Sequence, residues 1–285
     1  MVDPHVEPVA AGRSPVSFLV DYDGTISQVD IGDALLARHF SDAAELARKD
    51  ALYEAGRLGS RELIKWDMDV LPRDPELLVR EAAAMPNDPS FPGFVSGVRR
   101  RGAQLEVVSD GLGFYVRSNL AAMGLTDVPV ATNENRLADG GAGVSFPYGH
   151  PTCFVCGTCK RERVRLHQAV GRVVVFVGDG MSDRYAAAHA DVVFATGDLA
   201  RICADEGWPY HAWQNFDEVS AQVERAFTDG RLPLKAGDLP DWRARWARPP
   251  GPFICGPEVW GPGRTTPGPG PGPKTPDAGM PIIPQ

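Results

Sequence analysis

The chain lacks the features that would place it in a membrane or among secreted disulfide-rich proteins. No apolar run approaches the roughly 20 residues needed to cross a bilayer, and Met1 to His5 lack the basic-then-apolar pattern of a signal peptide. Only five of 285 residues are cysteine, and three of them crowd between positions 153 and 159, unlike a secreted disulfide framework. We therefore expect a cytoplasmic protein that does not bind membranes.

Positive charge is also scarce. The chain has 29 Lys and Arg against 37 Asp and Glu, for a formal net charge of −8. Because nucleic acids favour basic surfaces, this balance argues against nucleic acid as a partner. A small anionic substrate stays compatible with it, since a local cluster of positive groups can override the global charge. The chain is 43% hydrophobic and 23% charged, which is ordinary for a globular protein of one or two domains.

Composition separates a folded centre from two ends. Residues 1–14 show no periodic pattern, and residues 229–285 contain a Gly-Pro repeat that cannot build a core. Between them, apolar residues recur at helical spacing over 29–89. The predicted organisation is a disordered leader 1–14, an α/β core over 15–28 and 90–228, a helical cap over 29–89, and a disordered tail 229–285.

Two carboxylates directly follow the first predicted strand. Val16 to Val20 form a mostly apolar, β-prone run typical of a buried strand in a parallel sheet. Asp21 and Asp23 come next, and Gly24 permits a sharp turn. Ligands of open α/β sheets bind at the carboxyl ends of the strands. Because two acids so close repel each other, the pair predicts a bound cation or a shared proton.

Three further polar motifs follow along the chain. Ser109 comes after the predicted strand 105–108, Lys160 precedes a predicted helix 161–170, and Gly178 to Asp183 follow the predicted strand 173–177. Together with Asp21-x-Asp23-Gly24-Thr25, this series resembles the haloacid dehalogenase superfamily of phosphohydrolases over residues 16–225. The chain is most similar to the phosphoserine-phosphatase-like branch. The cysteine-rich approach to Lys160 and the run 191–195 resemble the methionine-salvage phosphatases that act on 2-hydroxy-3-keto-5-methylthiopentenyl-1-phosphate.

The resemblance implies a fold, a chemistry and a set of site residues. The fold would be a doubly wound, Rossmann-like parallel sheet with a small helical cap inserted after the first strand. The chemistry would be Mg²⁺-dependent hydrolysis of phosphomonoesters through an aspartyl-phosphate, with Asp21 as nucleophile and Asp23 as general acid and base. The implied residues are Asp21, Asp23 and Lys160 for catalysis; Thr25, Ser109, Asp110, Gly111 and Lys160 for the substrate phosphate; and Asp21, Asp23, Asp179 and Asp183 for magnesium.

Asp110 departs from the resembled branch, which usually has Ser-Gly-Gly where this chain has Ser-Asp-Gly. An extra carboxylate beside a phosphate site weakens phosphate binding unless it points away. Asp183 and Thr25 have a plain alternative as helix or turn caps. Substrate recognition rests on position alone, and its candidates are Lys65, Trp66, Asp67, Asn133 and Glu134.

A second candidate site recurs at every third residue: His150, Cys153, Cys156 and Cys159. Four such ligands can hold zinc in a tetrahedron, although this spacing is tighter than the usual two separated pairs. The alternative is a loop with reduced thiols that bind no metal.

The sequence predicts a Mg²⁺-dependent phosphatase of a small phosphorylated metabolite, with methionine salvage as the candidate pathway. A phosphatase of phosphoserine or of a phosphorylated amino alcohol is one alternative. A non-catalytic scaffold with a partner-binding tail is another, although a scaffold has no need of Asp21, Asp23, Lys160 and Asp179 together. Protein partners are not predicted.

Overall fold

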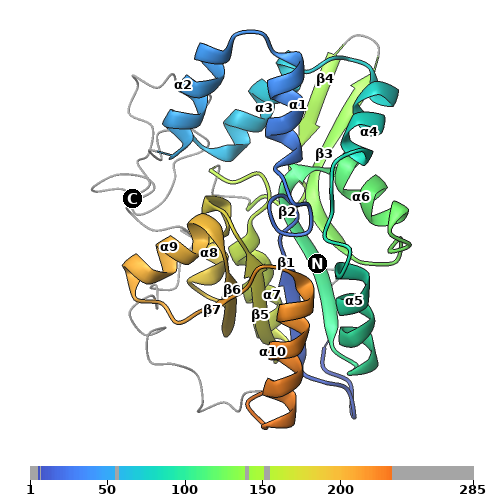
Figure 1. Ribbon diagram of the computed structural model, residues 1–285, viewed down its shortest axis with the longest axis vertical. Helices are drawn as coiled ribbons and strands as arrows, with labels where there is room; N and C mark the ends of the chain where they lie inside the picture. Colours follow the sequence, from blue (N-terminus) through green and yellow to red (C-terminus); the bar gives the residue numbers. More distant parts are fainter. Residues whose placement is uncertain (1–5, 7, 55–57, 139–140, 151–154, 233–285) are drawn as a thin grey trace.

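The computed structural model describes residues 6, 8–54, 58–138, 141–150 and 155–232 (Figure 1). Within these ranges the centre is a seven-stranded sheet in the order β4-β3-β2-β1-β5-β6-β7. Its neighbours are parallel except for the antiparallel hairpin of β3 with β4. The strands are β1 (Val16–Val20), β2 (Gln104–Leu112), β3 (Val130–Ala138), β4 (Gly141–Ser145), β5 (Val173–Gly178), β6 (Val192–Ala195) and β7 (His211–Ala212).

The central position of β1 follows from its sequence. All five of its residues are buried, as expected for a strand covered on both faces. Val20 at its carboxyl end pairs with Val107 of β2 on one side and Val177 of β5 on the other. β1 and β5 therefore end side by side, while β2 continues past them to Leu112, and the motif residues of the three strands meet at this edge of the sheet.

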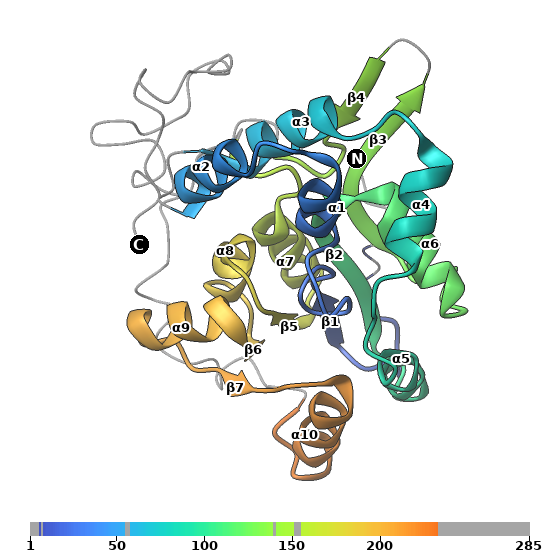
Figure 2. The same cartoon turned by 45° about the horizontal axis from the view of Figure 1, so that its top comes forward.

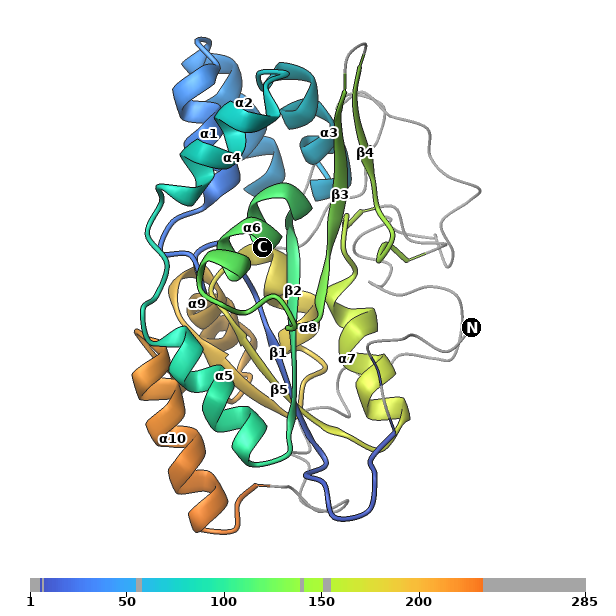
Figure 3. The ribbon, with the colours of Figure 1, turned by 90° about the vertical axis from the view of Figure 1, so that its right-hand side faces the viewer.

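Helices cover both faces of the sheet (Figure 3). Side chains alternate along a strand, so Phe18 packs on one face against Phe94, with ring centroids 5.3 Å apart, while Leu19 joins the core of the opposite face. The first face carries α5 (Phe91–Arg100), α6 (Gly113–Ala122) and α10 (Phe216–Thr228), and the second carries α7 (Lys160–Ala169), α8 (Arg184–Ala187) and α9 (Gly197–Glu206). The predicted doubly wound α/β fold is confirmed.

Four helices lie over the carboxyl ends of the strands and form the cap (Figures 1 and 2). They are α1 (Ile31–His39), α2 (Ala43–Glu54), α3 (Ser60–Val70) and α4 (Pro75–Ala83). Local signals start two of them: Asp30 accepts a hydrogen bond from the Asp33 amide at 2.9 Å, and Asp74 accepts one from the Leu77 amide at 3.0 Å. The cap inserted after the first strand is confirmed, while its boundaries and those of the core stay predictions.

The second strand is longer than the sequence pattern indicates. We expected it over 105–108 with Ser109 after its end, but β2 stays extended to Leu112, and α6 begins only at Gly113. Leu112 pairs with Asn133 of β3 after a shift of register. Pairing with β3 therefore overrides the turn preference of a Ser-Asp-Gly sequence.

The ends of the chain fall largely outside the described residues. These include residues 1–5 and 7 of the predicted leader and residues 233–285 of the predicted tail. Leu232 is buried in the main hydrophobic core. Among the described helices, none combines the length and apolar character required to span a bilayer.

Candidate active site

Lys160 joins the first and last motifs. Asp21 follows β1, and its amide donates to the carbonyl oxygen of Val177 in β5 at 2.9 Å. Lys160 is the first residue of α7, and its Nζ donates to Asp21 Oδ1 at 2.6 Å and to Asp183 Oδ1 at 2.7 Å. Ser182 Oγ accepts a third hydrogen bond from Nζ at 2.8 Å. Because Asp21, Lys160 and Asp183 are all buried, these charged hydrogen bonds are shielded from water.

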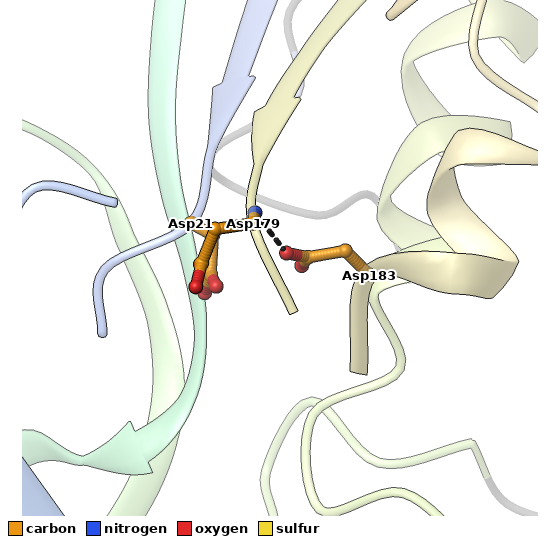
Figure 4. Close-up of side chains that lie close together, drawn as sticks. All are labelled: Asp21, Asp179 and Asp183. Atoms are coloured by element: carbon orange, nitrogen blue, oxygen red, sulfur yellow. Dashed lines mark hydrogen bonds between the residues drawn. The ribbon is translucent and has the colours of Figure 1, made fainter. Parts of the chain in front are cut away.

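Three carboxylates converge beside this lysine (Figure 4). Asp21, Asp179 and Asp183 each offer an oxygen atom, and the three atoms lie within 4.8 Å of one another. Asp183 is oriented by its other oxygen, which accepts hydrogen bonds from the amides of Asp179 at 2.9 Å and Gly180 at 3.1 Å. In the described ranges no other group of His, Cys, Asp or Glu meets this criterion. Oxygen ligands around an excess of negative charge fit Mg²⁺.

The electrostatics of the group agree with a need for a cation. Burial raises the pKa of Asp21, and the Asp183 charge raises it further. Burial, together with Asp183, also raises the pKa of Asp179 to about 7. Burial alone would lower the pKa of Lys160, but the two carboxylates beside it raise that pKa well above its usual value. The lysine therefore stays charged, and the remaining negative charge calls for a second positive charge.

Asp23 lies apart from that group and faces the cap. Its Oδ2 accepts a hydrogen bond from the Tyr115 hydroxyl at 2.9 Å, and its Oδ1 accepts one from the Ile31 amide at 3.1 Å. Burial raises the pKa of Asp23, and the nearby Asp30 charge adds to the shift. These two hydrogen bonds hold the Asp23 carboxyl in a defined direction.

The turn after β1 leaves no space for a larger residue at Gly24. Gly24 has φ +73°, and a Cβ there would collide with the carboxylate of Asp179. Thr25 Oγ1 donates a hydrogen bond to Asp179 Oδ1 at 2.8 Å. The first motif therefore supplies Asp21 and also orients the Asp179 carboxylate through Thr25.

The second motif is divided between two environments. Ser109 is fully buried, and its Oγ accepts a hydrogen bond from the amide of Gly111 at 2.9 Å. Asp110 accepts hydrogen bonds from the Thr158 amide at 2.7 Å and from the hydroxyl of Ser60 at the start of α3. The Asp110 carboxylate therefore links the cap to the loop that precedes Lys160.

The five residues that the sequence suggested for substrate recognition lie in different environments. Asp67 lines the cavity described below, whereas Asn133 is fully buried and donates to Asp110 Oδ1 at 3.1 Å. Trp66 packs edge-on against Phe40. Glu134 accepts a hydrogen bond from Arg117 at 3.1 Å, and the Lys65 ammonium lies 5.7 Å from the centre of the Phe146 ring.

The predicted zinc ligands do not assemble among the described residues. Cys156 and Cys159 form no disulfide, and with His150 they form no group close enough to share an ion. Cys153, the fourth residue of that pattern, lies outside the described residues.

A cavity of about 620 Å³ connects these groups to the cap. Asp21, Asp23, Lys160 and Asp179 line its floor, and side chains of α1, α2 and α3 line its other side. A small molecule can therefore reach the three-carboxylate group while contacting the cap.

Sequence reasoning missed several residues that hold the site. Tyr115 had no signal beyond its proximity to a motif, and Ser182 lies within the last motif but was given no role. Behind the site, Arg163 pairs with Glu106 at 2.7 Å, and His167 lies within hydrogen-bonding distance of Glu106, at 3.0 Å. These three side chains are buried and anchor α7 to β2, which no local pattern reveals because they are far apart in sequence.

The comparisons agree with this geometry. The family model of haloacid dehalogenase-like hydrolases matches residues 18–188. The 2-hydroxy-3-keto-5-methylthiopentenyl-1-phosphate phosphatase of an Exiguobacterium species is 27% identical over 213 residues, covering 72% of this chain and 96% of that protein. The protein of the same name from Brevibacillus brevis is also 27% identical, over 209 residues, covering 70% of this chain and 90% of its own length.

Solved structures show the same fold at low identity. A HAD family hydrolase from Salmonella enterica superposes with a TM-score of 0.58 at 15% identity, covering 73% of this chain and 70% of its own. A phosphoserine phosphatase solved as an analogue of its phospho-aspartyl intermediate gives 0.56 at 16% identity, covering 76% and 98%. The matched segment spans every predicted site motif from Asp21 to Asp183, and the chain therefore belongs to the haloacid dehalogenase-like hydrolase family.

Proposed function

We propose that this chain hydrolyses phosphomonoesters of small metabolites in a Mg²⁺-dependent reaction that passes through an aspartyl-phosphate on Asp21. The observation that carries the proposal is the Lys160 ammonium held between Asp21 and Asp183 beside a third carboxylate, Asp179. Phosphoryl transfer requires little besides a positioned nucleophile and positive charge around the transferred group. This arrangement supplies both.

Each residue has a defined task. An Asp21 oxygen attacks phosphorus, the bond from phosphorus to the ester oxygen breaks, and Asp23 gives its proton to the departing oxygen. Water then attacks the phosphorus atom, loses a proton to Asp23, and releases phosphate and the free Asp21 carboxylate. Lys160 stabilises the negative charge of the phosphoryl oxygens, and Ser109 and Gly111 are proposed to bind the phosphate from the second motif.

The magnesium ligands are proposed from the same geometry. Asp21 and Asp179, with the Asp23 backbone, would hold the ion, and Asp183 would bind it or orient the other ligands. The ion would supply positive charge against the phosphoryl oxygens. Hydrogen bonds from Thr25 to Asp179 and from backbone amides to Asp183 prepare these carboxylates for that role.

The substrate is proposed to be a small molecule, because helices α1, α2 and α3 of the cap line one side of the cavity. Sequence similarity offers one candidate, the methionine-salvage phosphate ester named for the relatives from Exiguobacterium and Brevibacillus. A phosphorylated amino alcohol is a second candidate, and the acidic side chains of Asp33, Asp50 and Asp67 that line the cavity favour a positively charged substrate group.

Phosphate release from a panel of small phosphomonoesters tests the proposal. We expect release that requires Mg²⁺, stops in excess chelator, and is abolished by Asp21→Asn. Asp127→Asn is the matched control, because that exposed carboxylate pairs only with Arg99 on the surface among the described contacts. Release that survives in Asp21→Asn at the native rate would reject the proposed nucleophile.

A further inference from the structure

Helix α7, which begins with Lys160, meets the sheet mainly through polar side chains. Val164 is the one apolar residue among the buried residues of this helix, and the others are Lys160, Arg161, Arg163 and His167. Apolar packing has no direction, and Cys159 at the start of the helix makes no side-chain cap hydrogen bond. A single buried valine and an uncapped start do little to fix the position of α7 along the sheet.

The polar side chains of α7 contact β1 at two places. Lys160 Nζ donates to Asp21 Oδ1 just beyond the carboxyl end of the strand, and His167 Nδ1 lies 3.0 Å from Ser17 Oγ near its start. Helix and strand therefore run antiparallel. Seven residues of helix span about 10.5 Å and four residues of strand about 13 Å, so the two contacts are compatible with one register of α7 on β1.

Glu106 of β2 contacts the same face of the helix between these two places. Three nitrogen atoms lie within hydrogen-bonding distance of its Oε2 atom: Arg163 Nη2 at 2.9 Å, Arg163 Nε at 3.3 Å and His167 Nε2 at 3.0 Å. Arg163 Nη2 also lies 2.7 Å from Oε1. All three side chains are buried. In the sheet Glu106 pairs with Leu19 of β1, the residue midway between the two contacts above.

A buried ionic cluster of this kind is weak evidence for stability. Apolar side chains of similar volume are often as stable or more stable, because charges are costly to remove from water. Directional contacts can instead fix the relative position of the elements that they join. Moving α7 by one residue would shift it by about 1.5 Å and turn it by about 100°, which would break the contacts of Glu106 and of Lys160 together.

We propose that Glu106, through Arg163 and His167, is a positioning residue that sets the register of α7 and thereby places the Lys160 ammonium beside Asp21. This inference rests on the phosphatase function proposed above, in which Lys160 stabilises the phosphoryl charge. A displacement of about 1 Å at a reacting centre can cost roughly 100-fold in rate. Glu106, Arg163 and His167 do not line the cavity, so they act through Lys160 and not by contact with the substrate.

Two substitutions of Glu106 separate its geometry from its charge. Glu106→Gln keeps the length of the side chain and an oxygen that can accept the hydrogen bonds made at Oε2, whereas Glu106→Asp keeps the charge but is shorter by one methylene group. We expect Glu106→Gln to keep kcat within about 3-fold of the native value. Glu106→Asp should lower kcat by at least about 10-fold, with KM changed by less than about 2-fold.

Both constants are measured with one small phosphomonoester and Mg²⁺, at a temperature well below the melting temperatures of the two variants. A kcat for Glu106→Asp that equals or exceeds the kcat for Glu106→Gln would overturn the inference, because a residue needed for charge or for folding alone gives that result. Arg165→Met, which changes an exposed side chain of the same helix, is the control and should leave kcat and KM unchanged.

Replacement of the whole cluster by apolar side chains gives a second test. A variant that combines Glu106→Leu, Arg163→Met and His167→Leu is expected to melt no lower than the native chain but to lose at least about 10-fold in kcat, because the remaining contacts have no direction. A folded variant with native kcat would overturn the inference. The two single substitutions of Glu106 decide the question if this variant fails to fold.

Failure of the native chain to release phosphate from any phosphomonoester would instead reject the phosphatase function. The register is then tested by a crystal structure of Glu106→Asp. We expect Lys160 Nζ to have moved away from Asp21 Oδ1, and a distance that stays at 2.6 Å would overturn the inference.

Discussion

Lys160 donates hydrogen bonds to two buried carboxylates at once, so we expect its substitution to affect both stability and activity. Its Nζ lies 2.6 Å from Asp21 Oδ1 and 2.7 Å from Asp183 Oδ1, and all three side chains are nearly inaccessible to water. Removing one partner from such a buried set leaves a charge without compensation, which costs more than the set contributes while intact. One side chain thereby holds both Asp21 and Asp183 in place.

Lys160→Met is therefore expected to abolish phosphate release and to lower the free energy of unfolding by about 3 kcal/mol near neutral pH in chelator-treated protein. Burial and the charge of Asp183 already hold the folded-state pKa of Asp21 well above its usual value. A carboxyl with a raised folded pKa destabilises the protein when ionised, and it ceases to do so as pH falls below that pKa. The stability deficit should thus shrink at mildly acidic pH in urea unfolding, and a deficit that grows on acidification would contradict this account.

At the scale of elements, the sequence revealed what lies within one strand or turn and missed what joins distant segments. β1 and β5 were predicted because a strand covered on both faces is a continuous apolar run. The extension of β2 to Leu112 depends on pairing with β3, so the local sequence Ser-Asp-Gly misled. Asp110 was expected beside the phosphate, but its partners Ser60 and Thr158 lie far away in sequence, and only the fold brings them together.

The link through Asp110 predicts a difference between two substitutions. Asp110→Ala removes the acceptor for the Thr158 amide and the Ser60 hydroxyl. Both the loop before Lys160 and the start of α3 then lose a hydrogen bond that holds them in place. We expect kcat/KM to fall by roughly 10-fold, the cost of an unsatisfied buried donor. Asp110→Asn keeps an oxygen that can accept from the Thr158 amide and should retain most of the native kcat/KM.

Steady-state kinetics on one small ester, with thermal melting as a check of folding, distinguishes this positioning role from direct phosphate binding. If the Asp110 carboxylate instead lay beside the bound phosphate and repelled it, both substitutions would raise the affinity for the ester. Asp127→Ala is the control, because its surface ion pair with Arg99 contributes little to stability.

At the scale of the whole molecule, the family and the class of chemistry were predictable because four motifs in a fixed order mark the edge of one sheet. The substrate end of the cavity was not, since Asp33, Asp50 and Asp67 come from three separate helices. Asp67 was a candidate by position only. Its acidic neighbours Asp33, Asp30 and Asp50 reach it only in the packed cap, which has no short sequence pattern.

Every residue of the proposed site lies between Asp21 and Asp183, and the described core extends to Leu232. A chain from which residues 233–285 are deleted is therefore expected to keep kcat/KM within about 2-fold of the value for the full chain. Such a difference is well below a tenfold change, which corresponds to roughly 1.4 kcal/mol in activation free energy. It should also keep the melting temperature of the full chain. Parallel assays of the two proteins measure both quantities, and a folded truncation with little activity would show that the tail contributes to the reaction.

The central claim, that Asp21 accepts the phosphoryl group, is tested most directly by acid quenching during turnover of a labelled phosphomonoester in the presence of Mg²⁺. We predict a phosphorylated protein from which hydroxylamine releases the labelled phosphate, as it does from an acyl phosphate. The label should lie on the peptide that contains Asp21 and should be absent from Asp21→Asn. Continued turnover with no labelled protein at any time, together with an active Asp21→Asn, would contradict the account and point to direct attack by water.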